Sequence, residues 1–293
     1  MPRAYVGVKH IIHHKKTNFN DLIYYFLEKN MGIIKNCKRI VIKIGTSTLT
    51  YQSGALNLRR IELLTRAVSD FKNAGHEVVM VSSGAVGAGF ARLALDEYPS
   101  TLAQKQACAA VGQGQLVKIY DGFFSNYGHT VAQILMTKDV VDDPHRLELA
   151  RNTFFTLIKM GCVPIVNEND SVSCEGLDFG GNDTLSAYVA IACQADLIIN
   201  LSDIDGLYNK DPRKHEDAVL IDRVEEITDE IRACAGGAGT NRGTGGMIAK
   251  INAADIASRN GIPMLIINGE DPHILYDILD GKHIGTYFAA RKD

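Results

Sequence analysis

Short unbroken runs of apolar residues alternate along the chain with longer stretches of helical periodicity. The first run, residues 40–44, consists of isoleucine and valine with one lysine, Lys43. An apolar β-branched run of this kind is typical of a strand buried on both faces, and such strands belong to parallel sheets covered by helices. Lys43 therefore either has an anion beside it or lies at a strand edge with its ammonium group reaching solvent.

The alternation of strands and helices continues along the rest of the chain. It predicts strands over residues 40–44, 77–81, 130–135, 162–166, 196–201 and 263–267, with a last piece at 283–288. It predicts helices over residues 61–74, 85–95, 102–127, 146–160, 185–193, 225–234 and 247–260. Residues 171–181 are short, polar and glycine-rich, which indicates a hairpin or flap, and the glycine-rich residues 235–246 indicate a loop. This order predicts an α/β fold with a largely parallel open sheet.

Composition narrows the class of protein. The chain has 293 residues, enough for a large core, and its formal net charge of −3 gives no sign of a nucleic acid partner. Six cysteines without a CxxC pair argue against a zinc site or a disulfide framework and favour a reducing compartment, so we expect a cytoplasmic protein. No apolar run reaches the roughly 18 residues that span a bilayer, so we expect no membrane association.

Residues 1–36 differ from the rest and are predicted to be an N-terminal extension, with the main domain at residues 37–290. Lysines and histidines precede an apolar piece at residues 19–27. A transit peptide is one interpretation, but Arg3 is the only arginine here, and Asp21 and Glu28 interrupt the pattern. A mobile tail or a docking helix is the other interpretation.

Four polar clusters fall where predicted strands pass into loops, at residues 43–48, 82–84, 167–170 and 202–205. Ligands bind at this edge of open α/β sheets. One cluster alone indicates no more than a turn or a helix cap, but four on successive strands favour a site. In the first cluster, Gly45 permits close approach of the backbone and three hydroxyl residues follow, so this strand end is a candidate phosphate contact.

A second candidate for phosphate binding is the sequence GTGG at residues 243–246, directly before a predicted helix that carries Lys250. Backbone amides at a helix start bind anions. The P-loop pattern GxxxxGK[ST] is absent, and the glycines at residues 84–89 have the spacing GxxGxG of helix packing rather than a dinucleotide fingerprint. Two lysines, glycine-rich turns and several carboxylates suggest phosphoryl transfer, with Mg²⁺ held mainly by nucleotide phosphates.

The motifs that carry a family resemblance are VIKIGTSTL, VSSGAVGAG, KQACAAVGQG, PIVNEND, GGNDTLSA, LSDIDGLY with DPR, and GTGGMIAK, in that order. Over residues 37–288 the chain resembles the glutamate 5-kinases of the amino acid kinase superfamily. The resemblance implies a three-layer α/β/α sandwich. It also implies ATP-dependent phosphorylation of the γ-carboxylate of L-glutamate to L-glutamyl 5-phosphate, the first step of proline biosynthesis.

The resemblance also implies residue roles. Lys43, Asp183 and Lys250 would be catalytic, and Ser83, Asp170 and Asn182 would hold glutamate. The residues implied to bind ATP are Lys43, Gly45, Thr46, Ser202, Asp203, Thr244, Gly245, Gly246, Met247, Ile248, Ala249 and Lys250. The resemblance assigns no metal ligand.

Partners follow from the same resemblance: proline as feedback inhibitor, glutamyl phosphate reductase as functional partner, and a homo-oligomer, either dimer or tetramer. The chain departs from the family pattern in its N-terminal extension and in the expected lack of a C-terminal RNA-binding-like module. Two rival functions are another kinase of the superfamily, acting on aspartate or acetylglutamate, and a sensor that binds proline or glutamate without turnover. Retention of Lys43, Asp183 and Lys250 argues against the sensor.

Overall fold

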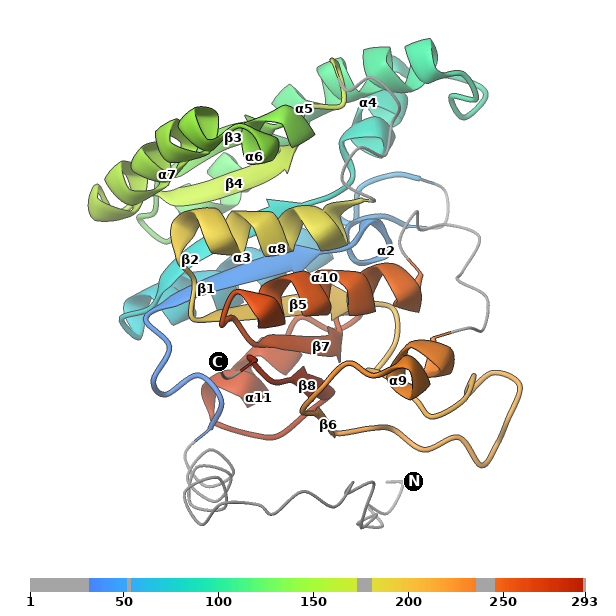
Figure 1. Cartoon of the computed structure of the whole chain (residues 1–293). Coiled ribbons are helices and arrows are strands. Elements are labelled where there is room, and N and C mark those ends of the chain that lie inside the picture. Colours follow the sequence, from blue (N-terminus) through green and yellow to red (C-terminus); the bar gives the residue numbers. More distant parts are fainter. Residues whose placement is uncertain (1–31, 52–53, 173–180, 236–245, 292–293) are drawn as a thin grey trace.

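Figure 1 shows the computed structural model, which describes residues 32–51, 54–172, 181–235 and 246–291. Within these residues eight strands form one sheet in the order β3-β4-β2-β1-β5-β7-β8-β6. Their bounds are β1 Arg39–Ile44, β2 Glu77–Ser82, β3 Val131–Met136, β4 Val163–Glu168, β5 Leu197–Ser202, β6 Arg223–Val224, β7 Met264–Asn268 and β8 Thr286–Phe288. The strands from β3 to β7 in this order are all parallel, and β8 runs antiparallel to β7. The predicted largely parallel open sheet is confirmed.

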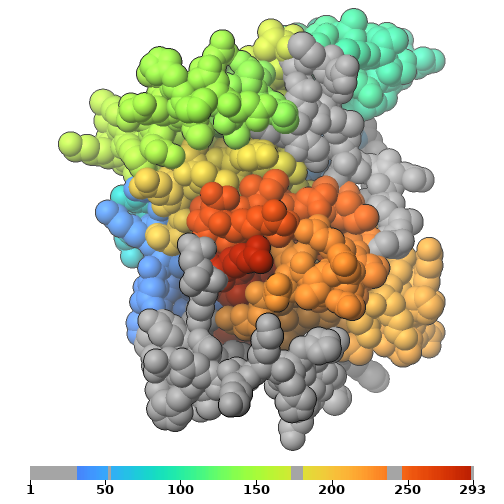
Figure 2. Space-filling model, viewed as in Figure 1, coloured from blue at the N-terminus to red at the C-terminus, as the bar shows by residue number. Residues whose placement is uncertain are grey.

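Helices cover both faces of the sheet, so the predicted three-layer α/β/α sandwich is also confirmed. On one face, Val41 and Ile198 belong to a core shared with α7 (Pro144–Lys159), α8 (Asn182–Cys193) and α10 (Met247–Arg259). On the other face, Ile40 and Leu197 belong to a core shared with α3 (Leu58–Asn73), α5 (Leu102–Ser125) and α11 (Ile274–Leu279). The space-filling view in Figure 2 shows the side chains of α8 and α10 closing over the middle of the first face.

Local capping sets the starts of the three longest helices. The side chain of Asn57 accepts a hydrogen bond from the Arg60 amide at the start of α3, and Thr101 forms a reciprocal capping box with Gln104 at the start of α5. Asp143 caps α7, whose first residue is a proline. All three observed helices agree with the predicted ones to within a few residues.

Four of the short elements were not predicted from the sequence. Helices α2 (Thr46–Leu49), α6 (Lys138–Asp142) and α11 and strand β6 have between two and six residues each, too few to produce a readable period. Helix α9 (Asp229–Cys234) begins four residues later than predicted because Thr228 caps it. Residues 1–31, 173–180 and 236–245, which hold most of the predicted extension, flap and glycine-rich loop, lie outside the described residues.

Helices α4 (Ala85–Leu93) and α5 pack with their backbones in direct contact. A Cβ atom added to Gly89 would overlap the carbonyl group of Cys108, and one added to Gly112 would overlap the carbonyl oxygen of Ala85. Glycine is therefore required at these crossings for steric reasons, as the GxxGxG spacing predicted for α4. The contact fixes the position of α5 relative to the turn that follows β2.

We expect Gly112→Ala to destabilise the protein by about 1–3 kcal/mol or more, because the overlap forces two helices apart. Gly114 provides a matched control on the same helix, since no described atom lies within 4 Å of a Cβ placed there. Gly114→Ala is expected to stabilise the helix by about 0.5–1 kcal/mol, as alanine replaces an exposed helical glycine. Urea unfolding midpoints measure both effects. A Gly112→Ala midpoint at or above that of the wild type would contradict the described packing.

Candidate active site

Lys43 lies near the carboxyl end of β1 on the face covered by α8 and α10. Its neighbour two positions back, Val41, belongs to the core on that face, and side chains two apart on a strand share a face. Only 5% of Lys43 is exposed. Its Nζ lies 2.6 Å from Oδ1 of Asp183, in the first turn of α8. The structure therefore places an anion beside this buried lysine. This is the first of the two interpretations of the sequence; the ammonium group does not reach solvent at a strand edge.

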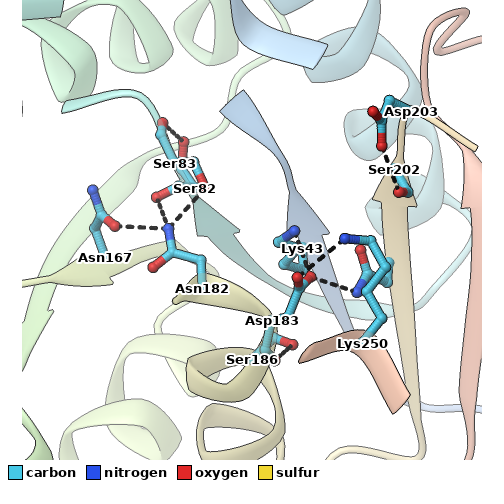
Figure 3. Close-up of polar contacts among 11 residues, drawn as sticks. Lys43, Ser82, Ser83, Asn167, Asn182, Asp183, Ser186, Ser202, Asp203 and Lys250 are labelled. Atoms are coloured by element: carbon cyan, nitrogen blue, oxygen red, sulfur yellow. Dashed lines mark hydrogen bonds and ion pairs between the residues drawn. The ribbon is translucent and has the colours of Figure 1, made fainter. Parts of the chain in front are cut away.

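Lys250 reaches the same carboxylate from the first turn of α10. Its Nζ lies 3.1 Å from Oδ2 of Asp183, and its side chain is also buried. Figure 3 shows the two lysines converging on Asp183. One carboxylate thus binds two ammonium groups that are far apart in the sequence, with a different oxygen for each.

Electrostatic coupling keeps this cluster charged. Burial lowers the pKa of Lys43, the Asp183 carboxylate opposes that shift, and the Lys250 ammonium group adds to it. Burial alone would raise the pKa of Asp183, but Lys43 and Lys250 outweigh burial and lower it to about 2. Two positive charges therefore share one negative charge, and a further anion bound between the lysines would be favoured electrostatically.

Asn200 on β5 is a member of this cluster that sequence analysis missed. It pairs in register with Lys43 across β1 and β5, is fully buried, and donates from Nδ2 to Oδ1 of Asp183 over 2.8 Å. The available signal was a single amide side chain in the apolar strand LIINLS. The hydrogen bond restrains the Asp183 carboxylate, so each of its oxygens stays directed at one lysine.

A second polar group joins β2, β4 and the start of α8. Nδ2 of Asn182 lies 2.9 Å from the Ser82 carbonyl oxygen, from Oγ of Ser83 and from Oδ1 of Asn167. Figure 3 shows these residues beside the lysine cluster. The structure therefore brings together two of the three residues predicted to bind glutamate, Ser83 and Asn182.

Asp170, the third residue predicted to bind glutamate, follows the carboxyl end of β4. Burial raises the pKa of its carboxyl group to about 6, and the nearby Glu168 carboxylate adds to the shift. A carboxylate in this environment gains from a cationic ligand, which offsets both burial and the negative neighbour.

The residues predicted to bind ATP lie mostly on the opposite side of Lys43. Ser202, at the end of β5, is buried and donates from Oγ to Oδ1 of Asp203 over 3.2 Å, whereas Asp203 is exposed. The start of α10 supplies Gly246, Met247, Ile248, Ala249 and Lys250. Thr244 and Gly245 lie outside the described residues.

Gly45 and Thr46 connect β1 to α2 beside the lysine cluster. A Cβ atom on Gly45 would lie 3.7 Å from Nζ of Lys43, so the backbone passes close to the ammonium group. Thr46 is the first residue of α2. The predicted phosphate contacts of this strand end are therefore adjacent to Lys43.

The strand order explains how the site is divided. Strands β4 and β2, whose carboxyl ends lead to Asp170 and Ser83, lie on one side of β1, and β5, which ends at Ser202, lies on the other. Lys43 is on the middle strand, with Asp183 over it. The geometry thus has two polar halves with a cationic centre between them, an arrangement suited to transfer of an anionic group from one half to the other.

Neither a metal-binding group nor a membrane-spanning helix is found among the described residues. No three or more of their His, Cys, Asp and Glu side chains are grouped so that they could hold a metal ion. Helices within the described ranges are all too short or too polar to cross a membrane.

Comparison with known proteins identifies the class of protein. The model of the amino acid kinase family matches residues 38–268, so the chain belongs to that family. Solved structures share the fold. Carbamate kinase from Giardia lamblia bound to AMP-PNP has a TM-score of 0.62 at 17% identity, covering 87% of this chain and 99% of its own. UMP kinase from Bacillus anthracis has a TM-score of 0.60 at 17% identity, covering 87% and 97%.

Closer relatives specify the branch of the family. A glutamate 5-kinase of Clostridium perfringens is 54% identical over 263 residues, which are 88% of this chain and 98% of the relative. A glutamate 5-kinase of Listeria monocytogenes is 48% identical over 264 residues, 89% of this chain and 96% of the relative. Within the amino acid kinase family, the chain belongs to the glutamate 5-kinases.

Proposed function

We propose that this protein catalyses ATP-dependent phosphorylation of the γ-carboxylate of L-glutamate, forming L-glutamyl 5-phosphate, the first step of proline biosynthesis. The observation that carries the proposal is the single carboxylate of Asp183 holding Lys43 and Lys250 between two polar halves of the site. Relatives named glutamate 5-kinase at about half identity support the choice of substrate.

In the proposed reaction, a γ-carboxylate oxygen of glutamate attacks the γ-phosphorus of ATP. A new P–O bond forms, the bond between that phosphorus and the β–γ bridging oxygen breaks, and ADP leaves. Lys43 and Lys250 neutralise the charge of the migrating phosphoryl group, and Asp183 holds them in position. The attacking carboxylate is already ionised near pH 7, so the reaction requires no general base.

The substrate roles follow the division of the site. Asp170 would pair with the α-ammonium group of glutamate, and Ser83 and Asn182 would offer hydrogen bonds to its polar atoms. Gly45, Thr46, Ser202, Asp203 and the segment from Thr244 to Lys250 would contact ATP. Mg²⁺ would be bound mainly by the nucleotide phosphates and would reduce their negative charge. Asp183 is not assigned as a ligand of the metal, because both of its oxygens already pair with lysine.

This assignment predicts how pH affects substrate binding. Asp170 must be ionised to pair with an ammonium group, and its pKa is raised to about 6. We therefore expect the KM for glutamate, at saturating MgATP, to rise about tenfold between pH 7 and pH 5, as protonation removes the negative charge. Asp170→Asn is expected to raise the KM at pH 7 and to abolish this pH dependence. A wild-type KM that is flat over this range would contradict the role of Asp170.

A panel of acceptors separates the proposal from its rivals. ADP release is measured with L-glutamate, L-aspartate, N-acetyl-L-glutamate, carbamate and UMP at equal concentrations. The proposal expects the highest kcat/KM with L-glutamate. Preference for another acceptor would favour a different kinase of the family, and binding of glutamate or proline with no turnover would favour the sensor.

We further propose the regulation and context that the family resemblance implied. Proline carries the ammonium and carboxylate groups of glutamate, so it is proposed as a feedback inhibitor competing for the glutamate half. The acyl phosphate product is unstable, which favours glutamyl phosphate reductase as the functional partner. A cytoplasmic homo-oligomer, dimer or tetramer, remains part of the proposal, as do an extension at residues 1–36 and a kinase domain at residues 37–290.

A further inference from the structure

Helix α5 contacts the ends of the two strands that Ser83 and Asp170, two of the proposed glutamate-binding residues, directly follow. Nε2 of Gln113 donates to the main-chain oxygen of Glu168, the last residue of β4, over 3.1 Å. The hydroxyl group of Tyr120 lies 2.9 Å from Oγ of Ser82, the last residue of β2. Both hydrogen bonds are buried. One helix thus bonds to two strand ends that are neighbours in the sheet.

The direction of the second hydrogen bond follows from the contacts of Ser82. Its hydroxyl group has one hydrogen, which it donates to the carbonyl oxygen of Ser83 over 3.1 Å. Tyr120 is therefore the donor and Ser82 the acceptor. Burial raises the pKa of Tyr120 far above its usual value, so the phenol keeps this hydrogen at all physiological pH values. The chain of bonds runs from Tyr120 through Ser82 to the main chain of Ser83.

The polar groups of Gln113 and Tyr120 are not required for packing. On the buried face of α5, Leu116 and Phe124 fill the core with apolar side chains alone. Gln113, only 5% exposed, and Tyr120, fully buried, lie on the same face but carry an amide and a hydroxyl group. Burying an amide or a hydroxyl group is unfavourable unless it forms a hydrogen bond. The bond that each forms is directed at the end of a strand in the proposed site.

The backbone contact between α4 and α5 fixes the position of α5 relative to the end of β2. Gly112 packs against the carbonyl oxygen of Ala85, two residues after Ser83. Gln113 is the next residue along α5, and Tyr120 lies about two turns further along the same helix. Gly112 and Gln113 lie in the KQACAAVGQG motif, to which the proposed reaction assigns no role.

We propose that Gln113 and Tyr120 are positioning residues for the glutamate half of the site. Gln113 fixes the end of β4 and thereby Asp170, and Tyr120 fixes the end of β2 and thereby Ser83. Neither side chain is assigned a contact with substrate. This inference rests on the proposed function, because it takes Asp170 and Ser83 as contacts for the amino acid.

Two variants test the inference, Gln113→Leu and Tyr120→Phe. Each is expected to raise the KM for glutamate about five- to tenfold, because the strand end is released from its hydrogen bond. The KM for ATP is expected to stay within about twofold, since α5 bonds to β2 and β4 and not to β5. Gln115→Leu, at a half-buried position of the same helix, serves as the control and is expected to change neither constant.

The pattern of constants separates positioning from general stability. A purely structural role would lower the active fraction and thus kcat, while leaving both KM values unchanged. Tyr120→Phe removes a single oxygen, so it keeps the test decisive if Gln113→Leu does not fold. An unchanged glutamate KM in a folded variant, or equal rises in both KM values, would overturn the inference.

The same assay separates this inference from the proposed function. A wild-type enzyme that turns over ATP with a different acid would overturn the proposed substrate, and the KM for that acid in the two variants would then decide the role of α5. A wild type without turnover on any acceptor would overturn both.

Discussion

Lys43→Ala is expected to lower kcat at least about a hundredfold, and Lys250→Ala to have an effect of the same order. The migrating phosphoryl group carries its charge on three equatorial oxygens, and these two ammonium groups are the cations that converge on the centre of the described site. A buried cation interacts more strongly with that charge than water does. Removing either lysine therefore removes stabilisation that acts in the transition state.

The fold should survive either substitution. When one lysine is lost, Asp183 keeps the other lysine and the hydrogen bond from Asn200, so its charge remains paired. Steady-state kinetics at saturating glutamate and MgATP measure kcat, and urea unfolding checks stability. Lys138→Ala provides a control, because Lys138 is exposed and pairs with Asp142 on α6, away from the cluster. Turnover within a few fold of the wild type in either lysine variant would exclude the proposed mechanism.

Asp183→Ala is expected to abolish measurable turnover and to destabilise the protein by about 3–5 kcal/mol at pH 7. Asp183 is the carboxylate bound to two buried ammonium groups, and its removal takes this counter-ion away from both charges in the interior. Positioning of both lysines is lost at the same time. This single change should therefore affect stability and activity together, unlike either lysine variant.

The loss of stability in Asp183→Ala is expected to depend on pH. In the wild type, the pKa of Asp183 is lowered to about 2, so the stabilisation from its ionised form is present above about pH 4 and is lost as the pH falls toward 2. In Asp183→Ala the unfavourable groups are the lysines, and burial already lowers the pKa of Lys43. The deficit relative to the wild type should shrink as the pH rises from 7 to 10, because a neutral amine is less costly to bury. Urea unfolding measures the difference in free energy of unfolding between the wild type and the variant. A difference that grows from pH 7 to pH 10 would contradict the pairing of Asp183 with the buried lysines.

The sequence predicted the central strands because their apolar runs have no alternation. It placed Lys43 at the carboxyl end of β1, and the resemblance added Asp183 and Lys250 as partners. The distance between the lysines was not predictable from spacing, because it depends on how α8 and α10 lie across the same face of the sheet. That packing places one carboxylate within 3.1 Å of both ammonium groups.

Helix α8 shows why the boundaries of the site were harder to predict. The apolar period begins at Leu185, so sequence analysis placed Asn182 and Asp183 before the helix, whereas the structure has both in its first turn. Gly181 precedes them with φ of 91°, a conformation that glycine adopts without strain. An acidic residue in the first turn is also favoured by the helix dipole.

The residues that sequence analysis missed act through long-range contacts. Asn200 bonds to Asp183 because β1 and β5 are neighbours in register. Gln113 and Tyr120 reach strand ends that lie about 55 and 38 positions away in the sequence. No local pattern encodes such pairings; the one visible sign was the isolated amide of Asn200 in an apolar strand.

Trapping of the product with hydroxylamine shows whether the phosphoryl group is transferred to the γ-carboxylate of glutamate. Hydroxylamine converts an acyl phosphate to a hydroxamate and releases phosphate, so it reports which carboxyl group received the phosphoryl group. The proposed reaction yields one γ-glutamyl hydroxamate for each ADP formed by the wild type, with both products reduced together in Lys43→Ala and Lys250→Ala. Formation of ADP in the presence of glutamate without γ-glutamyl hydroxamate would contradict it.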